Sequence, residues 1–273
     1  MLDAFFNLKY KGNTWFDGLK INDHPEAEKH RSAYPVINLD MKDLSVKNYD
    51  LFLSKVRTMI STLYADFVYL KDSEKVTERI RTLYFQEDPF FFDEARVRES
   101  VKMLCRMIYE HHGIKPIVLI DEYDSSLNNA YNTESYDEVL EFLKDFYSSI
   151  LKGNDYFEFA VMTGVMQIAK EGVFSGLNNL SVNNIFSKDF DERYGFTESE
   201  VKELCTYYGH PEKFEEAKEW YDGYRFGDAE IYNPWSVLSY VKYHFNAKPY
   251  WAGTSGNDII TTLLEYSTNH FLN

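Results

Sequence analysis

The residues best suited to chemistry stand at the end of a short apolar run. Ile117–Glu122 reads Ile-Val-Leu-Ile-Asp-Glu, so two adjacent carboxylates follow four consecutive apolar residues. Such a run predicts a central strand that is buried on both faces. Asp121 at the strand tip could hold Mg²⁺ through water, and Glu122 could orient and polarise an attacking water. This is the Walker B pattern; the alternative is a buried strand that runs into an acidic loop.

Two further polar residues follow this strand and the next one. Asp124 either adds to the metal site or caps the helix that follows, and the cap is favoured because Asp is a strong N-cap residue. Thr163 follows the apolar segment 157–162, where its hydroxyl could contact a γ-phosphate or the attacking water. Alternatively, Thr163 bonds its own turn, with Gly164 supplying the bend.

Basic residues that could contact phosphates are scattered. Lys170, Arg193 and Arg225 are candidates, and the alternative for each is a solvated surface position. Arg225, in the sequence Tyr-Asp-Gly-Tyr-Arg-Phe, is the first of them to test for nucleotide binding. The adjacent His111 and His112 end a predicted helix, where neighbours do not face one way, so interaction with the helix C-terminus is favoured over a metal site.

The phosphate-binding loop that normally accompanies a Walker B strand does not occur in this sequence. That loop has the form Gly-x-x-x-x-Gly-Lys-Ser/Thr, in which backbone N–H groups and the Lys cradle the phosphates. None of the 13 glycines is followed by Lys. We therefore expect these 273 residues alone to bind ATP poorly or not at all.

Composition bounds the class of protein. A chain of 273 residues with 44% apolar content can form one sizeable core and a smaller second unit. A surface with a net charge of −15 repels the phosphate backbone of a nucleic acid, which argues against nucleic-acid binding. No apolar run approaches the ~18 residues of a membrane helix, no signal-peptide pattern is present, and Cys105 and Cys205 show no metal spacing. These features predict a cytoplasmic protein without membrane contact.

The order of elements predicts an α/β fold. Short apolar strands alternate with amphipathic helices, which indicates a mostly parallel sheet flanked by helices. Strands are expected within 34–40, 116–120 and 157–162, and helices within 1–8, 49–64, 97–108 and 139–150. Beyond about residue 193 helices dominate, with a capping box at 197–200 and an Asn-Pro helix start at 233–234. We expect an α/β core over 1–192, a small helical lid or winged-helix unit over 193–245, and a tail over 246–273.

Several motifs, taken in order, resemble a known family. They are Tyr34–Asp40 (YPVINLD), Val118–Asp124 (VLIDEYD), Thr163–Val165, Phe174–Asn179, Trp220–Phe226, Asn233–Ser236 and Trp251–Asp258. The chain resembles the predicted AAA-ATPase-like family of bacteria over nearly its whole length. The resemblance implies a P-loop NTPase-like fold that uses ATP and Mg²⁺, with Asp121 in the Mg²⁺ role, Glu122 activating water and Thr163 as sensor.

The architecture of that family sets further expectations. Members carry a strand and a P-loop before a helix that resembles residues 1–6, and many carry a C-terminal domain resembling PD-(D/E)XK nucleases. The chain is therefore expected to be a fragment of an ATP-binding and ATP-hydrolysing switch. Gln167 stands where members often carry a basic residue.

Two other functions fit the same residues. A non-catalytic protein-interaction module would tolerate the loss of Asp121 and Glu122. Metal-dependent phosphodiester cleavage would use Asp121, Glu122 and Asp124, and would require tight Mg²⁺ binding without nucleotide and nicking of DNA.

Overall fold

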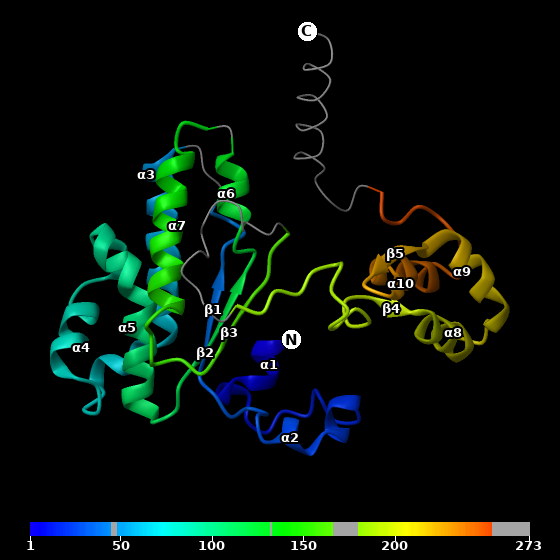
Figure 1. Cartoon of the computed structure of the whole chain (residues 1–273). Coiled ribbons are helices and arrows are strands. Elements are labelled where there is room, and N and C mark those ends of the chain that lie inside the picture. The colour runs from blue at the N-terminus through cyan, green and yellow to red at the C-terminus, as the bar shows by residue number, and fades with distance from the viewer. Residues whose placement is uncertain (45–47, 132, 166–179, 253–273) are drawn as a thin grey trace, which may run out of the picture. The chain divides into compact units, whose positions relative to one another are not determined.

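A computed structural model describes residues 1–44, 48–131, 133–165 and 180–252, and the chain divides into two compact units. The units are Met1–Asn179 and Leu180–Asn273 (Figure 1). The structure divides the chain after Asn179, whereas the sequence predicts a boundary after residue 192. The boundaries at 192/193 and 245/246 remain predictions. In the described part of the chain, no helix combines the length and apolarity that crossing a membrane requires.

The first unit is built on a parallel sheet, which confirms the α/β class. Its strands are β1 (Val36–Asp40), β2 (Ile117–Asp121) and β3 (Ala160–Met162), in the order β1-β2-β3. β3 is shorter than the predicted segment 157–162, although the Val118 N–H still donates to the Phe159 carbonyl at 3.1 Å. The carboxyl ends of all three strands lie at the same end of the sheet, because the strands run in the same direction.

Three long helices cover one face of this sheet. They are α3 (Tyr49–Asp66), α5 (Glu94–His112) and α7 (Tyr136–Leu151), grouped beside the strands in Figure 1. Their apolar stripes join the strand residues Ile37, Leu39, Val118 and Ile120 in one buried core. Gly113, at φ 71°, ends α5 as the sequence predicts, because glycine adopts the left-handed cap without steric cost.

Shorter elements complete the first unit. The helices are α1 (Leu2–Phe6), α2 (Pro25–Glu28), α4 (Glu78–Phe85) and α6 (Ser125–Ala130). The 3₁₀ turns are η1 (Leu8–Tyr10), η2 (Lys20–Asp23), η3 (Val68–Asp72) and η4 (Pro89–Phe91). Of these, η1, η3 and α6 matter below, because they border the two ends of the sheet.

The second unit combines a small antiparallel sheet with helices. In chain order it contains β4 (Phe196–Thr197), α8 (Glu198–Tyr207), η5 (Pro211–Lys213), α9 (Phe214–Tyr221), β5 (Asp222–Phe226), β6 (Ala229–Tyr232) and α10 (Pro234–Lys242). The sheet order is β4-β6-β5. The capping box of α8 and the Asn233 cap of α10 form as predicted. The sequence interpretation missed the β5–β6 hairpin, although its Gly227-Asp228 turn is a hairpin signal.

Candidate functional site

The carboxyl ends of the parallel strands bring the main predicted residues together. Asp121 ends β2 and pairs in register with Asp40 at the end of β1. Thr163 follows β3, and its Oγ1 donates a hydrogen bond to Oδ1 of Asp121. Backbone bonds fix this geometry, since the Thr163 N–H donates to the Ile120 carbonyl at 2.9 Å and the Tyr123 N–H donates to the Thr163 carbonyl at 3.0 Å. Thr163 therefore bonds the carboxylate that ends β2.

The Asp121 carboxylate is exposed at the strand tip and has coordination capacity left. Its Oδ1 also accepts the Glu122 N–H at 3.1 Å, whereas its Oδ2 has no partner among the residues described. Exposed carboxylate and hydroxyl oxygens suit Mg²⁺, which keeps several waters when one or two carboxylates bind it. Within the described ranges no group of three or more His, Cys, Asp or Glu side chains is arranged to hold a metal. The donor set therefore fits a hydrated cation on Asp121, with Asp40 beside it.

Glu122 leaves the strand through an uncommon backbone conformation. Its φ of 52° lies in the left-handed region, which non-glycine residues seldom adopt. The Ser125 N–H donates to the Glu122 carbonyl at 2.9 Å, which closes the turn into α6. A residue held in such a conformation requires surroundings that enforce it, and such residues concentrate at functional sites.

Asp124 is buried behind the strand tip and does not act as the predicted helix cap. It occupies the N-cap position of α6, but its side chain makes no capping hydrogen bond there. Its carboxylate instead accepts the Val165 N–H at 3.1–3.2 Å and Nδ2 of Asn128 at 3.1 Å. The cap interpretation is therefore corrected. The side chain is 1% exposed and ties the segment after Thr163 to the start of α6.

The approach between these segments is close enough to require glycine at position 164. A Cβ there would lie 2.5 Å from the Tyr123 ring and 2.6 Å from Oδ1 of Asp124. Tyr147 on α7 holds the other side, because its hydroxyl donates to the Tyr123 carbonyl at 2.8 Å. Burial, and then the nearby Asp124, raise the pKa of the Tyr147 phenol well above its usual value, so this donor stays protonated. We call these five residues, Tyr123, Asp124, Tyr147, Gly164 and Val165, the Asp124 latch.

The remaining candidates lie elsewhere or beyond the described residues. Arg225 is exposed on β5 and Arg193 is exposed before β4, both in the second unit. Lys170, Gln167 and the motif 174–179 fall outside the residues described. His111 Nδ1 lies 2.7 Å from the Ser73 hydroxyl and His112 Nε2 lies 2.8 Å from the Tyr69 hydroxyl.

Asp40 is a candidate site residue that sequence reasoning did not select. It appears in the sequence as the last residue of a strand-like motif, YPVINLD. The available signal was that parallel strands end on one edge, so an acid ending β1 lies beside an acid ending β2.

The parallel sheet, its helical layer and the polar residues at its carboxyl edge define an α/β domain consistent with the P-loop type. The chain belongs to the predicted AAA-ATPase family, since the family described as Predicted AAA-ATPase matches residues 1–174. A protein of Azotobacter chroococcum mcd 1, described as "Uncharacterized protein in vnfD 5'region", is 31% identical over 204 residues. That match covers 71% of this chain but only 38% of the relative. No solved structure matches the chain significantly.

Proposed function

We propose that the carboxyl ends of β1, β2 and β3 form the Mg²⁺ side of the nucleotide site of an ATP-binding and ATP-hydrolysing switch. The observation that carries this proposal is the hydrogen bond from Thr163 Oγ1 to Asp121 Oδ1, with Asp40 in register beside Asp121. Ligands of open α/β sheets bind outside the carboxyl ends of the strands. Membership of the predicted AAA-ATPase family supports nucleotide and Mg²⁺ use in general.

Each residue has a distinct part in this proposal. Asp121 would hold Mg²⁺ through water, and the bound ion would neutralise charge on the phosphates. Glu122 would accept a hydrogen bond from the attacking water and orient it. Thr163 would act as the sensor, because its hydroxyl can exchange the bond to Asp121 for one to a phosphate oxygen or to that water. Arg225 stays a candidate for nucleotide contact.

The 273 residues lack a Gly-Lys sequence, so the phosphates would lose the contacts that a P-loop supplies. Several charge-assisted hydrogen bonds, each contributing ~1.5–3 kcal/mol, would be missing. We therefore propose that this chain alone binds Mg²⁺-ATP with a Kd no tighter than about millimolar.

Two measurements test these statements separately. Calorimetry with Mg²⁺-ATP, on this chain and on Glu122→Gln, tests the affinity; micromolar binding would contradict the expected deficiency. Mn²⁺, a paramagnetic substitute for Mg²⁺, tests the metal role, because it broadens the amide NMR signals of nearby residues. We expect selective broadening of Asp40, Asp121 and Thr163.

A matched pair of variants makes the metal test specific. Asp121→Asn should abolish the selective broadening, whereas Asp155→Asn, an exposed carboxylate before β3, should leave it unchanged. Equal broadening in wild type and in Asp121→Asn would contradict the metal role of Asp121.

For the second unit we infer a winged-helix-like arrangement. The order β4, α8, α9, β5, β6, with the last strand in the middle of the sheet, supports it. In this arrangement α9 occupies the position of the helix that contacts DNA in DNA-binding winged-helix proteins. Its exposed residues include Glu215, Glu219 and Trp220. An acidic helix is unsuited to a phosphate backbone.

This acidic helix favours the second candidate function, a non-catalytic protein-interaction module. Beside Glu215 and Glu219, the aromatic side chains of Trp220 and Tyr224 are exposed. Under this alternative, Asp121→Asn and Glu122→Gln produce no phenotype in the host organism, whereas Trp220→Ala does. The opposite pattern would favour the nucleotide site.

A further inference from the structure

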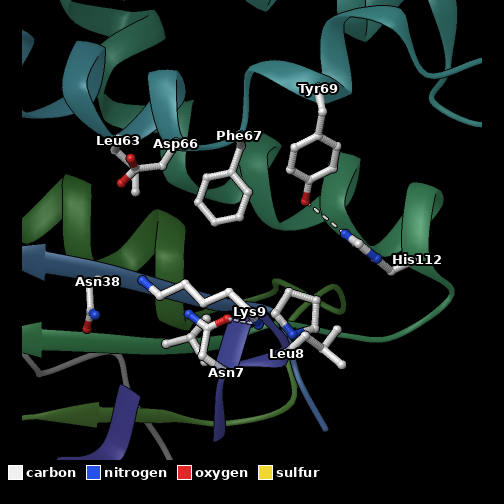
Figure 2. A pocket seen from close by; sticks show the side chains of 11 residues that line it. Asn7, Leu8, Lys9, Asn38, Leu63, Asp66, Phe67, Tyr69 and His112 are labelled. Atoms are coloured by element: carbon white, nitrogen blue, oxygen red, sulfur yellow. Dashed lines mark hydrogen bonds between the residues drawn. The ribbon is translucent and has the colours of Figure 1, made fainter. Parts of the chain in front are cut away.

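A slot of about 450 Å³ opens beside β1, toward the amino-terminal end of the sheet. The start of β1 forms its floor, and the end of α3, η3 and the end of α5 form its other walls, together with Asn7–Lys9 (Figure 2). We call it the β1 slot, with Lys9, Val36, Asn38, Asp66, Phe67 and Tyr69 as its main residues. The Asp121 site lies at the carboxyl ends of the strands, so the two places are distinct.

The side of β1 that faces away from β2 borders this slot, and no described strand bonds it there. The Ile117 N–H donates to the Pro35 carbonyl at 2.9 Å and the Met41 N–H donates to the Asp121 carbonyl at 3.0 Å. In a parallel ladder alternate residues bond one neighbour, so Val36, Asn38 and Asp40 direct their backbone groups away from β2. Within the described ranges no strand pairs with that edge.

A strand-like contact already begins at one end of this edge. Asn7 forms a parallel bridge with Tyr34, in which the Leu8 N–H donates to the Tyr34 carbonyl at 2.8 Å. The chain then turns away into η1, and the Lys9 side chain lies alongside β1 (Figure 2). The position next to Val36 and Asn38 therefore suits another extended segment.

The chemistry of the slot indicates what that segment would carry. Phe67 points into the slot and offers an apolar surface, and Tyr69, which is 40% exposed, adds a second aromatic ring to its lining. Asp66 has no hydrogen bond or ion pair among the described residues. Lys9, in contrast, is paired, because its Nζ lies 3.6 Å from Oδ2 of Asp3. The uncompensated charge in the slot is thus negative, as is the net charge of −15.

We propose that the β1 slot binds an extended, basic peptide segment of a partner protein, which adds to β1 as a further strand. The segment would place an apolar side chain against Phe67 and a Lys or Arg beside Asp66. Main-chain hydrogen bonds to the edge would supply affinity, and these two side chains would supply specificity. A second copy of this chain is disfavoured as the occupant, because two chains of charge −15 repel each other.

The test uses a fluorescein-labelled peptide of about ten residues that alternates valine with lysine, long enough to span a strand. A valine–glutamate peptide of equal length is the charge-reversed control. Fluorescence anisotropy should show saturable binding of the lysine peptide and none of the glutamate peptide. Asp66→Asn should weaken binding by about tenfold, since a charge-assisted contact is lost.

The edge itself is tested at Asn38, whose N–H points away from β2. Asn38→Pro removes that N–H, and proline is tolerated on an edge strand, so binding should fall by about tenfold or more. Asn38→Ala removes the same side chain but keeps the N–H, so it should bind the peptide several-fold more tightly than Asn38→Pro. Circular dichroism checks that both variants fold.

A measurement on the wild-type chain does not depend on the variants. Peptide binding should slow hydrogen exchange at the amides of Val36, Asn38 and Asp40, and leave Ile37 and Leu39 unchanged because these already bond β2. Three results would overturn the proposal: equal binding by Asn38→Pro, no protection at these amides, or concentration-dependent dimerisation through this edge in ultracentrifugation.

Discussion

Two aspartates three positions apart occupy opposite environments. Asp121 is exposed at the tip of β2 and bonds the Thr163 hydroxyl, and its second carboxylate oxygen has no partner in the described part of the chain. Asp124 is buried, and its carboxylate is used by the Val165 N–H and the Asn128 amide. An exposed carboxylate can exchange partners, whereas a buried one costs free energy when its partners are lost. Asp124 therefore holds the segment that presents Thr163, whereas Asp121 is the carboxylate available to the proposed site.

The strongest challenge to this contrast is to remove the buried carboxylate. Asp124→Ala leaves the Val165 N–H and the Asn128 amide without their acceptor, so we expect the free energy of unfolding to fall by about 3 kcal/mol. Urea denaturation followed by circular dichroism measures it. Asp121→Ala is the matched control and should cost under about 1 kcal/mol, because its site is exposed. Equal losses would remove the distinction between the two residues.

A smaller effect is expected when the latch is overpacked. Gly164→Ala places a methyl group within 2.6 Å of Tyr123 and Asp124 atoms, which should cost about 1–3 kcal/mol. It should also displace Thr163 and weaken the Mn²⁺ broadening at Asp121. Gly223→Ala is the control, since its Cβ would meet nothing within 4 Å. Wild-type stability in Gly164→Ala would show that the two segments can separate freely.

The hydroxyl of Tyr147 gives a finer test of the latch. Tyr147→Phe removes the hydrogen bond to the Tyr123 carbonyl while keeping the ring, so we expect a loss of about 1 kcal/mol in thermal or urea unfolding. Tyr131→Phe, at an exposed position, should change stability by less than about 0.5 kcal/mol. If the two variants behave alike, the Tyr147 bond contributes nothing to the latch.

The smallest change in stability is expected at the exposed partner of Asp121. Thr163→Val keeps the side-chain shape and removes the hydroxyl, so the free energy of unfolding should change by no more than about 0.5–1 kcal/mol. Mn²⁺ affinity should still fall several-fold, because Asp121 is no longer oriented, and Thr163→Ser should restore it. Unchanged Mn²⁺ binding in Thr163→Val would separate this residue from the metal site.

The sequence predicts the frame of the first unit well. The apolar run before Asp121 and the helical spacing around Val101 and Phe146 depend on local pattern, and both form as expected. The role of Asp124 was not predictable in this way, because its partner Val165 comes from a distant segment and the local signal favours a cap. Asp40 was missed for a related reason, since its neighbour in register is set by strand order.

The β5–β6 hairpin shows a different kind of failure. Both strands are short, β5 is largely exposed and β6 buries only its last two residues, so neither shows the apolar alternation that marks a half-buried strand. The turn residues Gly227 and Asp228 were the remaining indication, and they were outweighed by the neighbouring helical patterns.

The register of the parallel sheet also has a kinetic consequence. Asp40 and Asp121 meet only after α3, α4 and α5 have been traversed, so their pairing requires the closure of a very long loop. The β5–β6 hairpin closes across a two-residue turn, and local closures of this kind are fast. During refolding, the β5–β6 hairpin should therefore form early. The site around Asp40 and Asp121 should form among the last steps, because it requires β1 and β2 to have paired.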